Sequence, residues 1–260
     1  MEFLLGADPE VFVKIGDKFL SAFGLIKGDK KNPYKVPYGA VQVDGMALEF
    51  NIDPATNERE FVNNIQAVMA TLQAMVPDYE LAAVPTAYFG AEYIAEQPRA
   101  ATELGCEPDF NAYTGEENPT PNAKLPFRTG AGHVHIGWTE GADDPVHLDM
   151  AQQLVRELDV ILGLPSMVLD GDTKRREMYG KAGAYRVKDY GVEYRVLSNF
   201  WIQSEELIEF IYRGVTRAIT NLSEGNTLHT KYDIEAIINS GDMKMVNKII
   251  KKHNLLGDMV

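Results

Sequence analysis

The chain has a single cysteine, Cys106, among its 260 residues. A lone cysteine excludes a disulfide framework and a thiolate-rich metal site. Long apolar runs are also missing, since none approaches the ~20 residues that a membrane-spanning helix needs. The N-terminal MEFLLGADPE has no basic segment before its short apolar stretch, so we expect no signal peptide. From these absences we expect a protein of the cytoplasm.

Positive charge is scarce, with 25 Lys and Arg against 38 Asp and Glu and a formal net charge of −13. Nucleic-acid binding without sequence preference needs basic side chains that neutralise phosphates, and docking on anionic lipid needs the same sign of charge. Neither nucleic acid nor a membrane is therefore an expected partner. Phosphate-binding signatures are missing as well: there is no G-x-x-x-x-G-K-[ST] loop, and a strand rather than a helix is predicted after Gly130-Ala131-Gly132.

The length suits one large domain, and we predict a single domain over 1–260 with 203–260 as a helical C-terminal part. Apolar or alternating segments predict strands at 2–6, 10–15, 41–52, 80–84, 133–138 and 192–197. Apolar residues at helical spacing predict helices at 57–76, 145–163, 204–222, 232–239 and 242–253. Asn57 and Ser204 are the expected caps of the first and third helices, while Gly163 and Pro165 are expected to end the second.

These elements do not alternate with a regular βαβ rhythm, so the predicted fold class is α+β with a largely antiparallel sheet. Two stretches rich in Gly, Pro, Asn and Asp, 24–40 and 96–130, show no periodicity. Connections of that length are uncommon in compact domains and are usually either functional lids or disordered. We predict that they close over a site.

Polar residues occur in pairs, two positions apart, inside otherwise apolar strands. The pairs are Asp8 with Glu10, Glu49 with Asn51, His133 with His135, and Glu193 with Arg195. Alternate residues of a strand share a face, so the members of each pair point the same way while their apolar neighbours face the other way. An ordinary solvated sheet face is enough to explain any one pair. Four such pairs, including a His-x-His, favour one polar site.

Carboxylates gathered with imidazoles favour a divalent cation, and the excess of oxygen donors favours Mg²⁺ or Mn²⁺. A zinc hydrolase is the alternative, because His133, His135 and one glutamate would make three ligands. No H-E-x-x-H helix accompanies the two histidines.

A basic cluster interrupts the acidic chain at 174–195. It holds Lys174, Arg175, Arg176, Lys181, Arg186, Lys188 and Arg195. Arginine matches phosphate oxygens with a planar fork, and Gly180 and Gly183 permit close approach of the backbone. The cluster therefore favours a compact, multiply negative ligand such as a nucleoside triphosphate. A basic loop that pairs with acidic surface elsewhere is the alternative.

Several of these segments together resemble a known family. They are GADPE at 6–10, DGMALEFNIDPA at 44–55, GCEPDFNAYTG at 105–115, GAGHVHIGW at 130–138 and RREMYGKAGAYRVKDYGVEYRVLSNFW at 175–201. The chain resembles the glutamine synthetase-like carboxylate–amine ligases, most closely the phage-type (type 2) amidoligase branch. The resemblance spans most of 1–201. Glutamine synthetase differs in carrying an arginine where this chain has Gly191 and a glutamate where it has Asp8.

The resemblance implies a curved, largely antiparallel sheet that holds ATP with Mg²⁺ or Mn²⁺ and has helices packed on its outer face. It implies a metal set of Glu10, Glu49, His133 and Glu193, and nucleotide contacts from Arg176, Lys181, Arg186 and Arg195. The catalytic set that it implies is Arg195, Arg186, His135 and Asp8, with His135 near the substrate. The location would be the host cytoplasm if the chain is phage-encoded.

The implied reaction forms an amide through an acyl phosphate, because carboxylate oxygen is a very poor leaving group. Metals and arginines neutralise charge as the γ-phosphoryl group meets the carboxylate. Asp8 or His135 would take the proton from the amine. The expected partners are a small carboxylate and an amine. Two alternatives stay open, namely a guanidino-kinase-like phosphotransferase on the same scaffold and a non-catalytic nucleotide- or metal-binding module. The sequence leaves the oligomeric state open.

Overall fold

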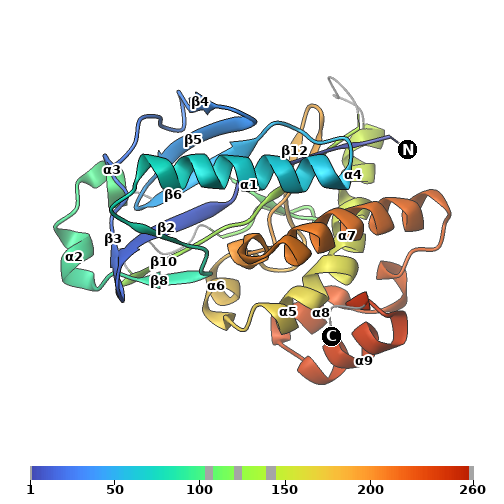
Figure 1. Ribbon diagram of the computed structural model, residues 1–260. Coiled ribbons are helices and arrows are strands. Elements are labelled where there is room, and N and C mark those ends of the chain that lie inside the picture. Colours follow the sequence, from blue (N-terminus) through green and yellow to red (C-terminus); the bar gives the residue numbers. More distant parts are fainter. Residues whose placement is uncertain (1, 103–107, 120–124, 139–144, 258–260) are drawn as a thin grey trace.

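The computed structural model describes residues 2–102, 108–119, 125–138 and 145–257. Cys106 lies outside them. The fold is α+β: the strands pair antiparallel and the helices pack against them (Figure 1). This confirms the predicted class. The predicted likeness to glutamine synthetase is a finer statement and stays a prediction here.

Hydrogen bonding divides the strands into three sheets, where the sequence predicted one. The five-stranded sheet has the order β1 (Leu4–Ala7), β11 (Val134–Gly137), β13 (Gly191–Tyr194), β12 (Ala184–Lys188) and β9 (Phe110–Asn111). The six-stranded sheet has the order β3 (Lys18–Leu20), β2 (Glu10–Ile15), β6 (Ala47–Ile52), β5 (Gly39–Asp44) and β4 (Tyr34–Val36), and β7 (Glu80–Ala82) also pairs with β2. A separate ribbon joins β8 (Thr86–Tyr88) to β10 (Phe127–Thr129).

The predicted strand at 41–52 is a hairpin. Asp44 pairs with Ala47 across a two-residue turn, and Gly45 has a φ of +58°. Asp-Gly between apolar segments is a strong signal for a turn of this kind, because glycine adopts positive φ without a steric penalty. The two loops predicted at 24–40 and 96–130 also hold regular structure, with β4 in the first and α3, β9 and β10 in the second.

The five predicted helices are present, one of them with a different end, and further short helices were not predicted. They are α1 (Glu58–Met75), α2 (Ala91–Ala95), α3 (Arg99–Thr102), α4 (Pro145–Leu158), α5 (Leu164–Leu169), α6 (Thr173–Met178), α7 (Glu205–Ser223), α8 (Ile234–Ser240) and α9 (Met243–His253). Short 3₁₀ segments lie at Asn199–Gln203 and His229–Lys231. Asn57 and Ser204 cap α1 and α7 as predicted, by accepting from the backbone N–H groups of Glu60 and Leu207.

The predicted end of the second helix at Gly163 was wrong. The chain continues from α4 through a π turn, Asp159–Gly163, directly into α5. Pro165 is the second residue of α5 and directly follows the π turn and Leu164. The π turn is fully buried, so tertiary packing holds the helix together across the glycine.

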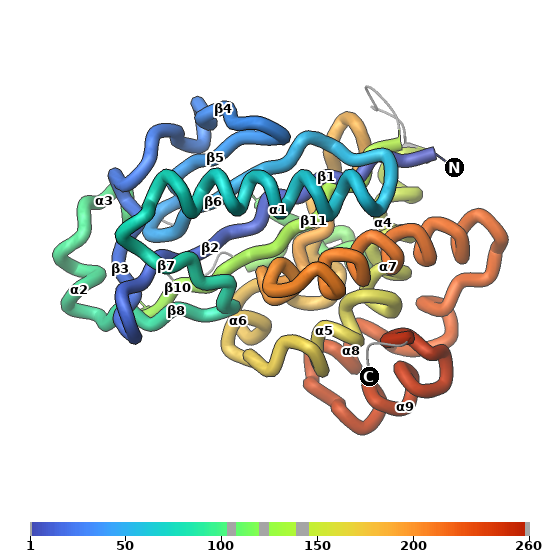
Figure 2. Tube along the Cα trace, in the orientation of Figure 1, coloured from blue at the N-terminus to red at the C-terminus, as the bar shows by residue number. Residues whose placement is uncertain are grey.

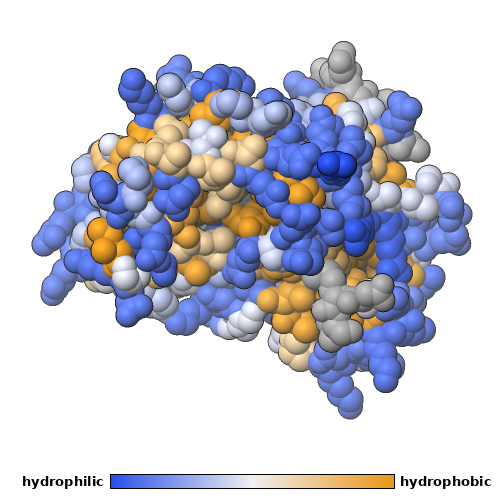
Figure 3. All heavy atoms as spheres, viewed as in Figure 1, coloured by the Kyte–Doolittle hydropathy of each residue, from blue (hydrophilic) through white to orange (hydrophobic). Residues whose placement is uncertain are grey.

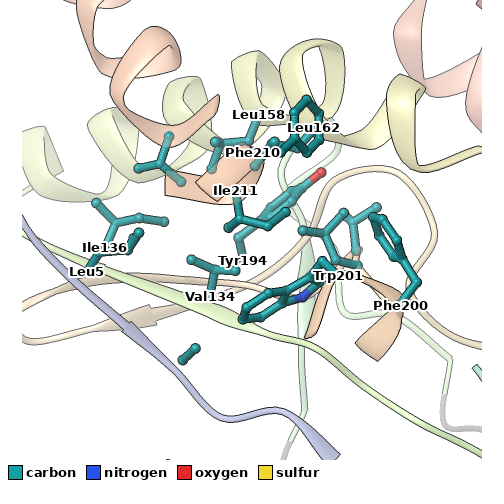
Figure 4. Close-up of a cluster of buried hydrophobic side chains, with 14 of the residues drawn as sticks. Leu5, Val134, Ile136, Leu158, Leu162, Tyr194, Phe200, Trp201, Phe210 and Ile211 are labelled. Carbon is teal, nitrogen blue, oxygen red and sulfur yellow. The ribbon is translucent and has the colours of Figure 1, made fainter. Parts of the chain in front are cut away.

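The helices cover one side of the two larger sheets. α1 packs on β5 and β6, α4 packs on β12 and β13, and α7 lies beside both helices (Figures 1 and 2). Figure 4 shows Leu5, Ile136 and Tyr194 pointing from their strands toward Leu158 and Ile211 on the helices. On the face seen in Figure 3, apolar surface shows between the mainly hydrophilic outer sides of the elements.

One buried core cluster contains residues from Leu5 to Leu255 and includes α8 and α9. The organisation of 1–260 as a single domain stays a prediction. Among the described residues, no helix combines the length and the apolar character that crossing a membrane requires.

Candidate active site

A first row of polar side chains crosses the five-stranded sheet. The register of β11, β13 and β12 sets His135 opposite Glu193 and Glu193 opposite Arg186. On the other face of β13, Val192 and Tyr194 are buried in the core against the helices. Period-2 alternation therefore fixes Glu193 on the side away from the helices.

A second row crosses the six-stranded sheet. There Glu10 of β2 lies opposite Glu49 of β6, and Glu49 lies opposite Gln42 of β5. Gln42 Nε2 donates to Glu49 Oε1 at 2.9 Å. The polar residues of both sheets thus follow from strand register.

The two rows meet where β1 is joined to β2 through Asp8 and Pro9. Figure 2 shows that the chain keeps roughly the same direction from β1 into β2. The backbone N–H of Asp8 donates to the carbonyl of His133 at 3.3 Å, and that of Glu10 donates to the carbonyl of Ala131 at 2.8 Å. Both sheets are therefore tied to the segment around Gly132. Together they form a pocket of about 400 Å³. Its charged lining comprises Asp8, Glu10, Lys30, Asp44, Glu49, Arg128, His133, Arg186, Lys188, Glu193 and Arg195.

Three carboxylates form an acidic group at one end of this pocket. Oxygens of Glu10, Asp44 and Glu49 lie within 4.8 Å of one another. Burial, and next the charge of Asp44, raises the pKa of Glu10 to about 8. Burial, and then the charge of Asp8, raises the pKa of Glu49 well above its usual value. Lys30 offsets part of this negative charge, because its Nζ lies 2.8 Å from Asp44 Oδ2. An acidic group that resists ionisation in this way fits a divalent cation.

A basic group in the same pocket is organised by Glu193, whose side chain is 1% exposed. Arg186 Nη1 and Lys188 Nζ each lie 3.0 Å from Glu193 Oε2, and Arg195 Nη1 binds Oε1. Burial opposes ionisation of Glu193, but the neighbouring cations, Arg195 foremost, hold its pKa at about 2. Arg195 also donates from Nε to Asp109 at 3.1 Å.

The two histidines differ in their partners. His135 Nε2 lies 3.2 Å from Asp8 Oδ2, and its Nδ1 lies 2.6 Å from the hydroxyl of Tyr190. Burial opposes protonation of His135, but the charge and hydrogen bond of Asp8 outweigh it, so the pKa is raised. His133 lies 3.3 Å from Arg195 Nη1, and its burial and the charge of Arg195 hold its pKa well below the usual value.

The ligand-spaced groups differ from the predicted metal set. Among the described residues, the second such group contains Asp8, His135 and Glu193, and neither group contains His133. The two histidines therefore do not form the three-ligand zinc site that was the alternative. His133 Nδ1 lies 3.3 Å from Arg195 Nη1 and 3.5 Å from Glu193 Oε1.

The predicted basic cluster is divided. Arg186, Lys188 and Arg195 line the pocket, but the predicted nucleotide contacts Arg176 and Lys181 do not. Arg176 donates from Nη2 to Ser166 Oγ at 3.1 Å, and Lys181 is exposed. Asn51, predicted to share the site with Glu49, does not line the pocket either.

The glycines of that cluster serve the fold. A Cβ at Gly180 would come within 2.3 Å of Arg175 Nη1, and one at Gly183 within 2.7 Å of Asn111 Oδ1. Both have positive φ, +71° and +75°. Gly191, where glutamine synthetase carries an arginine, also has a steric reason: a Cβ there would lie 1.9 Å from the carbonyl oxygen of Ile136, so no side chain fits.

Sequence reasoning did not single out several residues that line the pocket, namely Lys30, Asp44, Arg128, Tyr179 and Lys188. It also missed Asp109, which contacts Arg195. Asp44 had a signal, since Asp44-Gly45 marks a hairpin whose first strand carries Gln42 toward Glu49. Tyr179, whose hydroxyl accepts from Arg195 Nη2, and Arg128 stand in no local pattern. Only tertiary structure brings them to the pocket.

The pocket can thus place a cation at one end and phosphate or carboxylate oxygens at the other, with a paired imidazole and carboxylate at its edge. No curated protein matches the chain. Twenty-two chains of solved structures match, including a bifunctional glutathione synthetase from Pasteurella multocida at 10% identity and a TM-score of 0.44. That match covers 98% of this chain but 45% of the synthetase, so the chain spans less than half of that protein's length.

A family model covers more than half of the chain. The model for the phage phiEco32-like COOH.NH2 ligase-type 2 family matches residues 114–253. The matched region contains β11, β12 and β13, with His133, His135, Arg186, Glu193 and Arg195. The chain therefore belongs to the phage phiEco32-like COOH.NH2 ligase-type 2 family.

Proposed function

We propose that the protein joins a carboxylate to an amine in an ATP-dependent reaction that proceeds through an acyl phosphate. The observation that carries the proposal is one pocket with an acidic group, Glu10, Asp44 and Glu49, facing a basic group built on Glu193. Family membership supplies the reaction class, a carboxylate–amine ligase. The likeness of the catalytic fold to glutamine synthetase belongs to this proposal, as does the small-molecule nature of both substrates.

Glu10, Asp44 and Glu49 would hold Mg²⁺ or Mn²⁺. Three carboxylates whose oxygens lie within 4.8 Å of one another fit the oxygen preference of these ions. Burial, and then the charge of a neighbouring carboxylate, raises the pKa of Glu10 and Glu49. A bound divalent ion supplies positive charge to the phosphate oxygens of the nucleotide. The second ligand-spaced group, Asp8, His135 and Glu193, has other roles in this proposal, because Glu193 pairs with three cations and His135 pairs with Asp8.

Arg186, Lys188 and Arg195 bind and orient phosphate oxygens in this proposal. Their shared carboxylate, Glu193, holds all three cations on one face of the sheet before a ligand arrives. Such preorganisation reduces the reorganisation needed when negative charge moves from nucleotide to acyl phosphate. The planar fork of Arg195 is itself fixed by Asp109 at 3.1 Å and by Tyr179.

His135 and Asp8 form the proton acceptor for the amine. The carboxylate of Asp8 stabilises the protonated imidazole from 3.2 Å, so His135 can take a proton as the amine attacks the acyl phosphate. The hydroxyl of Tyr190, 2.6 Å from Nδ1, fixes the orientation of the ring. The nitrogen–carbon bond forms as the carbon–oxygen bond to phosphate breaks, and inorganic phosphate leaves.

Two variants test the proposal through ADP release from ATP with panels of acids and amines. Glu193→Gln removes the carboxylate shared by Arg186, Lys188 and Arg195, so we expect loss of ADP release together with a lower melting temperature. Glu49→Gln removes one member of a repelling group, so we expect loss of ADP release with an unchanged or higher melting temperature in chelator.

The two variants should both lose ADP release, but only Glu193→Gln should have a lower melting temperature. This difference separates an effect on catalysis from an effect on folding. Glu177→Gln, the same chemical change on the exposed side of α6, is the control and should alter neither property. Retained turnover in Glu193→Gln or Glu49→Gln would refute the assignment. A phosphorylated product without an amide would replace it by a phosphotransferase, and MgATP binding without turnover by a binding module.

A further inference from the structure

Arg128 of β10 lines the pocket, and two of its three guanidinium nitrogens make no hydrogen bond. Its Nη1 donates to the carbonyls of Leu125 at 3.0 Å and Phe127 at 2.9 Å. Its Nε and Nη2 are buried without a partner, and the residue is 8% exposed. The carbonyl contacts fix the guanidinium in place, so the unused donors are held in one orientation.

The unused donors form a recognisable unit. Nε–H and the Nη2–H beside it are the side-on fork of a guanidinium, whose spacing matches the two oxygens of a carboxylate or two oxygens of a phosphate. No described carboxylate pairs with Arg128, whereas Arg195 has both Glu193 and Asp109. Burial lowers the pKa of Arg128. A buried guanidinium that lacks a counter-ion is completed by an anionic ligand.

The surroundings of Arg128 differ from those of the phosphate-facing residues. Arg186 and Arg195 belong to the five-stranded sheet side of the pocket, whereas Arg128 belongs to the β8–β10 ribbon. The pocket wall also includes Phe12, Met46, Ala47 and Ala101, which are apolar and buried. An apolar wall beside a fixed cation suits methylene groups that end in an anion.

The chain also limits how far Arg128 lies from the acidic group. It lies three positions before Ala131, whose backbone N–H donates to Glu10 Oε2 at 2.8 Å. Three extended residues span at most about 10 Å between Cα atoms. One small molecule can therefore reach from the acidic group to Arg128.

We propose that Arg128 binds a second anionic group of the acid substrate, so that the substrate class is a dianionic acid whose two anionic groups are joined by an apolar spacer. This inference rests on the proposed function, because it places the reacting carboxylate at the metal-binding carboxylates. Arg128 is then the residue that selects diacids over monoacids.

The first experiment measures binding, without turnover, by the full chain. Melting temperatures are recorded with MgADP and then with succinate, glutarate or adipate, with butyrate or hexanoate as monoacid controls, and with 3-phosphopropionate as the phosphate-bearing arm. We expect a rise with at least one dianion and none with the monoacids, at matched ionic strength. Equal rises with monoacids and dianions would overturn the inference. The relative effect of 3-phosphopropionate identifies the second group as carboxylate or phosphate.

The second experiment uses Arg128→Gln and Arg128→Lys in the ADP-release assay. Loss of one bidentate charged contact is expected to raise KM for the acid by about 10- to 100-fold in Arg128→Gln. KM for ATP should stay within about twofold, and Arg128→Lys should recover part of the loss because it keeps the charge. An equal rise in KM for ATP would overturn the inference and assign Arg128 to the nucleotide.

Failure of the inference and failure of the proposed function are distinguishable. ADP release with monoacids as efficient as with diacids leaves the ligase intact and removes the role of Arg128. Dianion binding that depends on Arg128, without ADP release from any acid and amine, keeps the anion site and removes the ligase. If Arg128→Gln does not fold, the comparison of diacids with monoacids in the unchanged protein still decides.

Discussion

The acidic group predicts that stability and metal binding depend on pH through Glu10. The perturbation is Glu10→Gln, studied with a chelator and with Mg²⁺. Glu10 has its pKa raised from 4.5 to about 8 in the folded chain, first by burial and next by the charge of Asp44. Its carboxyl group is therefore neutral in the folded chain at a pH where the unfolded chain ionises it.

The direction of the pKa shift of Glu10 determines how stability changes with pH. A group whose pKa is raised by folding contributes stability that is fully present below its unfolded pKa and is lost as the pH rises through the folded value. For a rise from 4.5 to about 8, that contribution falls by about 2.7 kcal/mol between pH 6 and pH 9, at 1.36 kcal/mol per pKa unit. Because the side chain of Glu10 is only half-buried and keeps contact with solvent, this change in the free energy of unfolding is an upper value.

The assay is denaturant unfolding in chelator between pH 6 and pH 9, for the unchanged chain, Glu10→Gln and the control Glu177→Gln. The unchanged chain and the control should lose stability in parallel, and Glu10→Gln should lose less. Glu49 remains in the variant and titrates in the same direction, so the difference between the curves isolates Glu10. Parallel curves for all three proteins would refute the reasoning.

Mg²⁺ should reverse the trend, because a carboxylate must lose its proton to bind a metal. With a pKa of about 8, the ionised fraction of Glu10 rises by about 90-fold between pH 6 and pH 9, and the apparent affinity for Mg²⁺ should rise with it. Isothermal titration at both pH values measures this. An affinity that is constant with pH would place the ion away from Glu10.

Two further predictions concern the basic group and the core. Arg195→Lys keeps the charge but loses the fork shared by Glu193 and Asp109, so kcat for ADP release should fall by about 10- to 100-fold while the circular dichroism spectrum is unchanged. Phe61→Ala removes a fully buried ring stacked 6.0 Å from Trp201, and should cost about 3–5 kcal/mol in urea unfolding with ADP release at low temperature retained.

Much of the fold could be predicted because apolar periodicity is a local signal. The helices α1, α7, α8 and α9 lie within a few residues of their predicted bounds, since each has one apolar face and a side-chain cap. The continuation of α4 through Asp159–Gly163 was missed because burial of a whole turn, not local propensity, decides it. The shortest elements, such as β9 and β10, have too few residues to show a period.

The site could be predicted where strand alternation carries it. Asp8, Glu10, Glu49, His133, Glu193 and Arg195 all line one pocket, as their paired spacing suggested. Charge clustering along the chain was a poorer guide. Arg176 and Lys181 lie within the basic cluster by sequence but outside the pocket, because helix and loop geometry turn neighbours in different directions. Arg128 was missed for the opposite reason, since it is an isolated cation in a stretch predicted to be a loop.

The charge balance around individual pocket residues explains why the pocket would bind both a cation and an anion. Buried Glu193 and half-buried Glu10 lie in one pocket, yet the pKa is about 2 for Glu193 and about 8 for Glu10. The difference comes from neighbours: Glu193 has three cations within contact, whereas Glu10 has two carboxylates and the partial compensation of Lys30. Arg128 has the converse deficit, a cation without an anion.

The protein thus leaves one site short of positive charge and another short of negative charge within about 10 Å of chain. A divalent ion and an acid that together satisfy both deficits would bind more tightly than either alone, because each removes a charge that the other's site leaves unbalanced. Cooperative binding of Mg²⁺ and a dianionic acid, measured by titrating one at fixed levels of the other, is the expected consequence, and independent binding would contradict it.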